Sequence, residues 1–244
     1  MTIIGLFGSA GRMGRAISEV IAETPGAFAG PAIDREDSTD VFVAGSADVL
    51  IDFSTPSALG DHLCVAVERG MPIVIGTTGL EREHHRAIDE AARHVAILQT
   101  GNTSLGVNLL AHLVREAASR LGPDWDIEIV EMHHRHKVDA PSGTALLLGE
   151  AAAEGRRVDL ARVSDCGRDG ITGARKPGDI GFAALRGGSV AGDHQVIFAA
   201  EGERIELGHR AENRVIFARG AVKAALWLAD KAPGRYRMGD VLGI

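Results

Sequence analysis

The sequence predicts an α/β protein in which a doubly wound parallel sheet is joined to a second, α+β domain with a mixed, largely open sheet. From residue 2 to about residue 104, short apolar runs alternate with amphipathic stretches at helical spacing, as in a parallel sheet with crossover helices. After residue 104 the alternation stops, and strand-like segments follow one another without helices between them. We therefore expect two domains, residues 1–104 with 215–244 and residues 105–214.

The composition is that of an ordinary globular protein, with 45% hydrophobic and 24% charged residues in a chain of 244. The formal net charge of -7 disfavours nucleic acid and anionic membranes as partners, because both require positive surface. Cys64 and Cys166 lack metal-type spacing, and a reducing compartment suits them. The first residues lead directly into a strand rather than a secretory signal, and no apolar run approaches the ~20 residues that span a bilayer. We expect a cytoplasmic protein.

A glycine-rich turn directly follows the first expected strand, at residues 2–7. The segment Gly8-Ser9-Ala10-Gly11-Arg12-Met13-Gly14 opens an amphipathic helix. This order is typical of a Rossmann-like dinucleotide fold, in which Gly8 and Gly11 admit a pyrophosphate and Gly14 lets the helix pack close to the strand. The spacing is Gly-x-x-Gly-x-x-Gly rather than G-x-G-x-x-G, so a plain tight turn is the alternative interpretation.

The second expected strand, at residues 27–33, ends at Asp34-Arg35. An acidic residue about twenty positions beyond the glycines is placed to hold a ribose 2′-hydroxyl, whereas an arginine suits a 2′-phosphate. The pair leaves NADH and NADPH open as cofactors. A solvated strand end in a charged loop is the alternative.

Two further strand ends carry small residues. Strands are expected at 49–53, 72–75 and 95–98, with helices at about 57–69 and 81–93 between them. Ligands of open α/β sheets bind at the carboxyl ends of the strands, so small polar residues there strengthen the dinucleotide interpretation. The segments that follow the last two strands are Gly76-Thr77-Thr78-Gly79 and Thr100-Gly101-Asn102-Thr103-Ser104.

The second domain begins with a long helix at about 106–120, which stops at Leu121-Gly122-Pro123. A strand containing Ile127 and Ile129 follows. The remaining expected elements are a helix at 142–154, strands at 180–185, 195–200 and 204–207 with Gly202 in a hairpin turn, and a last helix at 215–228 that packs back on the first domain.

A basic loop, from residue 133 to residue 144, separates that strand from the helix at 142–154. It contains His133, His134, His136 and Lys137, whose ordinary pKa values are about 6.5 for histidine and about 10.4 for lysine. The helix start adds free N–H groups and the positive end of a dipole. We interpret the loop as a pocket for a small carboxylate with a proton donor. A solvated basic turn is one alternative interpretation, and a metal site is another. The histidine spacing does not place two imidazoles on one helix face, and no H-E-x-x-H motif is present, so no metal is expected.

The loop and its flanks resemble the signature of the 4-hydroxy-tetrahydrodipicolinate reductase (dihydrodipicolinate reductase) family, enzymes of the diaminopimelate route to lysine. The resemblance extends over nearly the whole chain, and its long central motif is highly specific. That motif reads Glu128-Ile129-x-Glu131-x-His133-His134-x-x-Lys137-x-Asp139-Ala140-Pro141-Ser142-Gly143-Thr144-Ala145.

The resemblance implies NAD(P)H-dependent reduction of 4-hydroxy-tetrahydrodipicolinate, a cyclic imine dicarboxylate, to tetrahydrodipicolinate. It implies that His133 acts as acid/base, that Lys137 donates a proton, and that His134, Gly143 and Thr144 hold the substrate. Hydride arrival puts negative charge on the ring, which a nearby ammonium stabilises and protonates. The family is usually a homotetramer that assembles through the sheet of the second domain.

The resemblance also assigns the cofactor positions, with one departure. Thr103 stands where the family often has an aromatic residue, which removes a packing contact expected near the nicotinamide. The matching positions are Gly8, Ser9, Ala10, Gly11, Arg12, Met13, Asp34, Arg35, Gly76, Thr77, Thr78, Thr100, Gly101, Asn102 and Thr103.

Three other functions are compatible with parts of the pattern. A semialdehyde or homoserine dehydrogenase is the first, although a semialdehyde dehydrogenase needs a nucleophilic cysteine that the settings of Cys64 and Cys166 do not suggest. A regulator that binds a nicotinamide nucleotide without turnover is the second. A metal-dependent hydrolase built on the loop histidines is the third.

Overall fold

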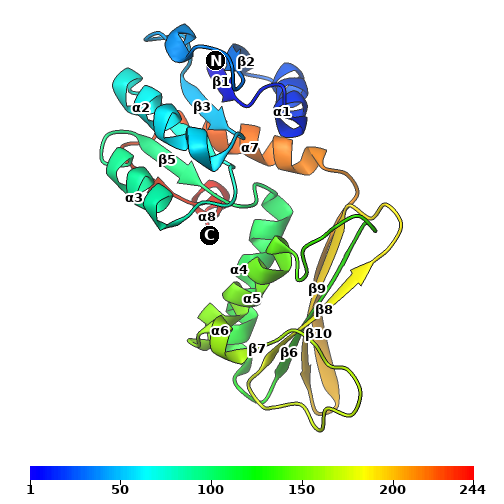
Figure 1. Ribbon diagram of the computed structural model, residues 1–244. Helices are drawn as coiled ribbons and strands as arrows, with labels where there is room; N and C mark the ends of the chain where they lie inside the picture. Colours follow the sequence, from blue (N-terminus) through cyan, green and yellow to red (C-terminus); the bar gives the residue numbers. More distant parts are fainter. The chain divides into compact units, whose positions relative to one another are not determined.

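A computed structural model describes residues 1–244 and divides the chain into two compact units. Unit 1 consists of Met1–Leu105 and Val215–Ile244, and unit 2 of Gly106–Arg214. Figure 1 labels most of the helices and strands of the two units. None of the helices combines the length and the apolar character needed to cross a membrane.

Unit 1 is built on a parallel sheet, which confirms the predicted doubly wound architecture. The strands lie in the order β11-β5-β4-β3-β1-β2. β2 lies on one side of β1, whereas β3 and the later strands lie on the other side. The direction in which strands are added therefore reverses between β1 and β3, and ligands of such sheets bind at this point. The bounds are β1 Thr2–Phe7, β2 Ala27–Ile33, β3 Val49–Asp52, β4 Ile73–Ile75, β5 Ala96–Gln99 and β11 Gly234–Tyr236.

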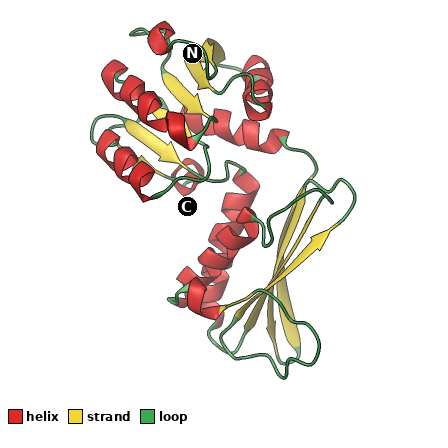
Figure 2. Cartoon of the chain, viewed as in Figure 1, coloured by secondary structure: helices red, strands yellow, loops and turns green.

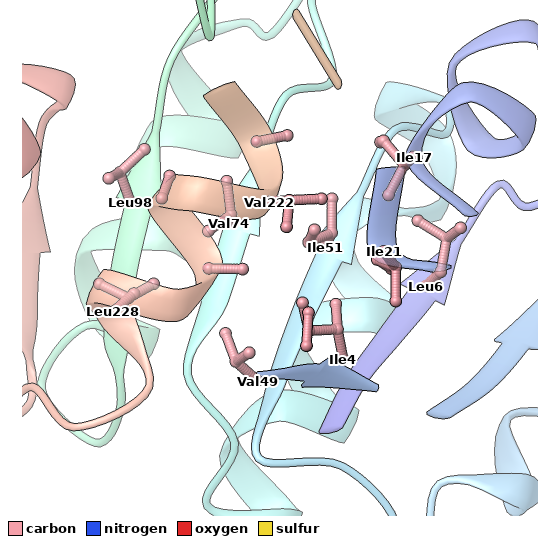
Figure 3. Close-up of a cluster of buried hydrophobic side chains, with 14 of the residues drawn as sticks. Ile4, Leu6, Ile17, Ile21, Val49, Ile51, Val74, Leu98, Val222 and Leu228 are labelled. Atoms are coloured by element: carbon pink, nitrogen blue, oxygen red, sulfur yellow. The ribbon is translucent and has the colours of Figure 1, made fainter. Parts of the chain in front are cut away.

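Helices cover both faces of this sheet, because successive strand residues point to opposite faces. On one face, Ile17 of α1 and Val222 of α7 pack with Ile51 of β3, as Figure 3 shows. On the other, Leu63 of α2 and Ile88 of α3 belong to a second core. The helix bounds are α1 Arg12–Glu23, α2 Leu59–Arg69, α3 Arg82–Ala91, α7 Val215–Leu228 and α8 Met238–Leu242, with short 3-10 turns η1 Thr39–Val41 and η2 Pro56–Ala58.

Unit 2 contains a mixed sheet, as predicted, in the order β10-β9-β6-β8-β7. β6 pairs parallel with β8 and antiparallel with β9. The predicted hairpin at Gly202 joins β9 to β10, and its φ of 80° is of the sign that glycine adopts freely. The strand bounds are β6 Asp126–His133, β7 Ser164–Asp165, β8 Ile180–Arg186, β9 Gly192–Ala200 and β10 Glu203–Ala211.

Helices cover one face of the second sheet, and Figure 2 shows no helix on its other face. Val114 of α4 and Leu148 of α5 share a core with Ile129 of β6. The two helices approach closely at Gly155, where an added Cβ would lie 2.4 Å from the carbonyl oxygen of Arg115. The bounds are α4 Leu105–Leu121, α5 Gly143–Arg156 and α6 Leu160–Val163.

Several elements differ from the sequence-based expectation. β11 and α8 follow α7, which was expected to be the last element; β11 is held by backbone pairing with β5 and has no apolar alternation to reveal it. β7 and α6 are too short to give a periodic signal. β9 and β10 extend beyond the expected ranges 195–200 and 204–207, because backbone pairing continues past their apolar residues.

Candidate active site

A cavity of about 680 Å³ lies in unit 1 at the carboxyl ends of β1, β2 and β3, where the strand order reverses. Its walls are formed by the glycine turn, the end of β2 with the segment that follows it, the residues after β3 and the start of α2. The predicted cofactor residues that line it are Gly8, Ala10, Gly11, Asp34 and Arg35.

The glycine turn depends on two of its glycines. Gly8 has a φ of 81°, and a Cβ there would lie 2.3 Å from the carbonyl oxygen of Phe53. A Cβ on Gly14 would lie 2.2 Å from the carbonyl oxygen of Gly8. α1 begins after Gly11 without a side-chain cap, so its first N–H groups are open to an anion.

Replacing Gly14 with alanine is therefore expected to destabilise unit 1. The added methyl group meets backbone oxygens, which cannot move as a flexible side chain can, and overpacking of this kind costs about 1–3 kcal/mol. The Gly14→Ala variant should unfold at lower denaturant concentration and bind NADH more weakly. Gly60→Ala is the matched control: it adds the same methyl group to an exposed position of α2 with no atom within 4 Å, and should be neutral or stabilising. A Gly14→Ala protein as stable as the control would contradict the packing.

Asp34 fixes the end of β2 against the glycine turn. Its carboxylate accepts hydrogen bonds from the backbone N–H of Arg35 at 2.8 Å and of Ala10 at 2.9 Å, and these bonds lower the pKa of Asp34. The carboxylate of Asp37 accepts the N–H of Asp34 at 2.8 Å. The cavity is therefore negatively charged where β2 ends.

The other predicted cofactor residues do not line this cavity, and two of them have buried hydroxyl groups with partners inside the unit. The hydroxyl of Thr77 donates to the buried Asp52 at 2.9 Å. The hydroxyl of Thr103 donates to the carbonyl oxygen of Phe217 in α7 at 2.7 Å. Those outside the cavity lining are Ser9, Arg12, Met13, Gly76, Thr77, Thr78, Thr100, Gly101, Asn102 and Thr103.

In unit 2, the loop histidines divide between a strand and a turn. β6 ends at His133, which lies on the same buried face as Ile129 and Glu131. His134 and His136 follow after the end of the strand, in the loop. His133 thus points into unit 2, whereas His136 is exposed.

The buried partner of His133 is Glu131, which is 1% exposed. Its carboxylate lies 2.5 Å from Nδ1 of His133, accepts two hydrogen bonds of 2.8 Å from Arg186, and accepts the N–H of Ser142 at 3.2 Å. Burial raises the pKa of Glu131, but the hydrogen bonds from Arg186 and His133 outweigh it, so that the pKa lies below its ordinary value. Glu131 is therefore a carboxylate at neutral pH.

Lys137 is paired within the loop. Its Nζ donates to both oxygens of Asp139 at 2.8 Å, and this contact lowers the pKa of Asp139. The Lys137 side chain is 20% exposed and the Asp139 side chain 55%. An incoming carboxylate therefore competes with Asp139 for this ammonium group.

His134 contributes less charge to the loop than its ordinary pKa suggests. Burial and the neighbouring cation Arg214, whose Nη2 lies 3.3 Å from His134 Nε2, lower the pKa of His134. The positive charge of the site comes mainly from Lys137, Arg186 and Arg214.

The start of α5 adjoins this loop and contains the two predicted backbone contacts. Ser142 is the N-cap residue, with its hydroxyl accepting the N–H of Ala145 at 3.2 Å. Gly143 is exposed, and a Cβ placed on it would meet no atom within 4 Å. Thr144 follows and is partly exposed. This surface can admit a carboxylate.

Metal binding is not supported by the arrangement of side chains. No group of three or more His, Cys, Asp or Glu residues converges to hold an ion. Two ring nitrogens that a metal could use already have hydrogen-bond partners. His133 Nδ1 contacts the carboxylate of Glu131, and His194 Nε2 lies 3.0 Å from the hydroxyl oxygen of Ser142.

Comparison with known proteins identifies the family. Residues 2–103 match the family model described as "Dihydrodipicolinate reductase, N-terminus", and residues 106–242 match "Dihydrodipicolinate reductase, C-terminus". The chain belongs to the dihydrodipicolinate reductase family. This confirms the membership predicted from the loop sequence.

Individual members of the family are similar over their whole length. The 4-hydroxy-tetrahydrodipicolinate reductase of Zymomonas mobilis is 58% identical over 251 residues, which cover 99% of this chain and 97% of that protein. That of Parvibaculum lavamentivorans is 57% identical over 260 residues, covering 97% and 96%. The solved structure "Dipicolinate bound Dihydrodipicolinate reductase from Paenisporosarcina sp. TG-14" has a TM-score of 0.80 and 22% identity over 97% of each chain, which shows the same fold.

Several residues of both sites were not predicted. Ser54, Thr55 and His62 line the cavity; the first two follow a strand of the parallel sheet, as the other predicted cofactor segments do, and this position was the signal that could have revealed them. Arg186, on β8, had no sequence signal because it reaches Glu131 only through pairing of β8 with β6. The period of two along β6 did offer a signal for Glu131, which falls on the face of His133.

Proposed function

We propose that this protein reduces 4-hydroxy-tetrahydrodipicolinate to tetrahydrodipicolinate with NADH or NADPH, in the diaminopimelate route to lysine. The observation that carries the proposal is the loop from His133 to Thr144, which combines a buried histidine, a lysine and a helix start in a member of the reductase family. These are the groups that reduction of a cyclic imine dicarboxylate needs.

Unit 1 is the dinucleotide-binding domain in this proposal. The pyrophosphate binds the backbone from Gly8 to Met13 at the start of α1, and the adenosine ribose lies beside Asp34 and Arg35. The nicotinamide half is held by the segments at the ends of β4 and β5. The residues of those segments are Gly76, Thr77, Thr78, Thr100, Gly101, Asn102 and Thr103, with Thr103 contributing through its backbone because its hydroxyl is buried against α7.

Unit 2 binds the substrate. One carboxylate lies on the N–H groups of Gly143 and Thr144, and His134 donates a hydrogen bond as a neutral imidazole. The ammonium group of Lys137 gives up its hydrogen bonds to Asp139 and binds the substrate instead. The open face of the sheet, where Leu185 is exposed, joins the subunits of a homotetramer, which sedimentation tests.

The chemistry divides between the cofactor and the loop. The bound cofactor supplies a hydride. Lys137 stabilises the negative charge that develops on the ring and donates the proton, and His133 acts as acid/base beside it. With the loss of the 4-hydroxyl group as water, one hydride and one proton account for the conversion of substrate to product.

NADH is the preferred cofactor in this proposal. Asp34, Asp37 and Asp61 line the cavity with a single cation, Arg35, and a 2′-phosphate adds about -1.5 to -2 charges at neutral pH. We expect kcat/KM for NADH to exceed that for NADPH about tenfold, or about 1.4 kcal/mol. Arg35→Ala should raise KM for NADPH more than KM for NADH, whereas Arg69→Ala, at the exposed end of α2, should change neither. A preference for NADPH in the wild-type protein would contradict this charge balance.

A coupled assay tests the proposed reaction. The product of the preceding synthase is mixed with the protein and NADH or NADPH, and loss of reduced-cofactor absorbance is followed. We expect loss that requires both synthase product and protein. Binding of NADH without turnover would refute the proposal in favour of a regulator that senses the nucleotide.

A further inference from the structure

We propose that Glu131 is a positioning residue that holds His133 with its proton on Nδ1 and ties the histidine to the start of α5 and to the loop of Lys137. The functional meaning of this inference rests on the proposed function, because that gives His133 and Lys137 their roles. The contacts that Glu131 makes within unit 2 do not depend on that function.

The pleat of β6 explains why the two side chains meet. Glu131 and His133 are two residues apart on one strand, so they point to the same face. Both are largely buried, with exposed fractions of 1% and 8%. Glu131 Oε2 lies 2.5 Å from His133 Nδ1, within hydrogen-bond distance.

Arg186 compensates the buried carboxylate. β8 pairs with β6 in a register that places Arg186 opposite His133, and both terminal nitrogens of its guanidinium group donate to Glu131 at 2.8 Å. The same guanidinium donates to the carbonyl oxygen of Asp139 at 2.7 Å. The ion pair therefore also holds the backbone of the loop that carries Lys137.

The fourth contact joins Glu131 to the anion-binding surface. Ser142 donates its N–H to Glu131 Oε1 at 3.2 Å and is the N-cap of α5, directly before Gly143 and Thr144. One carboxylate thus contacts β6, β8 and α5. The histidine, the lysine loop and the helix start are assembled around it.

The hydrogen-bond count fixes the histidine tautomer. Each oxygen of Glu131 accepts two bonds, from Arg186 and Ser142 on Oε1 and from Arg186 and His133 on Oε2. An ionised carboxylate only accepts, so Nδ1 of His133 must carry a proton. Nε2 is then the atom that exchanges a proton. Its edge of the ring faces Gly192, where an added Cβ would lie 3.0 Å from Nε2.

The direct test is a long-range ¹H–¹⁵N correlation spectrum of the wild-type full-length protein labelled with ¹⁵N-histidine. His133 is assigned by the loss of its signals in the His133→Gln variant. We expect neutral His133 to carry its proton on Nδ1. A proton on Nε2 would overturn the inference, and this measurement requires neither substrate nor a variant of Glu131.

A variant measures the consequence. Glu131→Gln should shift the His133 signals and lower kcat about 10- to 100-fold, the range known for carboxylates that orient metal-bound histidines, with KM for NADH within about twofold of wild type. Glu150→Gln, on an exposed position of α5, should leave the His133 signals and kcat unchanged.

A Glu131→Gln enzyme with unchanged kcat would overturn the inference. An inactive wild-type protein would refute the proposed function instead, and the wild-type tautomer alone would then decide the role of Glu131.

Discussion

Replacing Lys137 with alanine is expected to lower kcat by about 10²- to 10⁴-fold, the range for removing a general acid or base. Lys137 is the loop cation whose ammonium group is held ready by Asp139 at 2.8 Å and is partly open to solvent. In the proposed mechanism, its loss removes both the proton donor and the charge that stabilises the ring as hydride arrives. Steady-state kinetics with saturating synthase product and NADH measures the effect.

The affinity for NADH should stay within about twofold in the same Lys137→Ala variant, because the predicted nucleotide site belongs to unit 1 and Lys137 to unit 2. A fluorescence titration with NADH provides this value. Lys176→Ala is the matched control, since Lys176 is exposed and forms no ion pair. Turnover of Lys137→Ala equal to that of the control would remove Lys137 from the mechanism.

Replacing His133 with alanine should lower kcat by about 10²-fold or more, and should alter NADH affinity less. His133 is the one histidine of the loop that lies on a strand and is buried, with Nδ1 bound to Glu131. Removing it leaves Glu131 with one donor fewer and removes the imidazole edge at Gly192. The measurements are kcat and the NADH dissociation constant.

The matched control for this variant is His136→Ala, because His136 is in the same loop but exposed. It should retain wild-type turnover. If His133→Ala weakened NADH binding more than it lowered kcat, His133 would belong to the cofactor site. The double variant of His133 and Lys137 should lose less than the product of the two single effects, since groups that act in one step are not additive.

The parallel sheet of unit 1 was predictable because its buried strands are apolar and separated by helices with clear start and stop signals. Val49–Asp52 and Ile73–Ile75 are examples of such strands. Gly234–Tyr236 was not predictable, since its place in the sheet depends on pairing with β5 rather than on its own residues. In unit 2, β9 and β10 were predicted, but the predicted ranges were too short, because the ends of both strands carry polar residues such as His194 and His209.

The candidate site in unit 2 was predictable as far as it is contiguous in sequence. His133, Lys137 and Gly143 belong to one motif, and the structure places them between β6 and the start of α5. Arg186 reaches them through tertiary pairing alone. The protonation states of the site could not be predicted from the sequence either. Burial lowers the pKa of His194 to about 4, and no residue pattern indicates that this histidine is buried.

A crystal structure of the protein with pyridine-2,6-dicarboxylate tests the central claim most directly, because this compound has the ring and both carboxylates of the proposed substrate class. We expect one carboxylate on the backbone N–H groups of Gly143 and Thr144, with Lys137 turned from Asp139 toward the ligand. The compound bound elsewhere, with Lys137 still paired to Asp139, would contradict the claim that this loop is the substrate site.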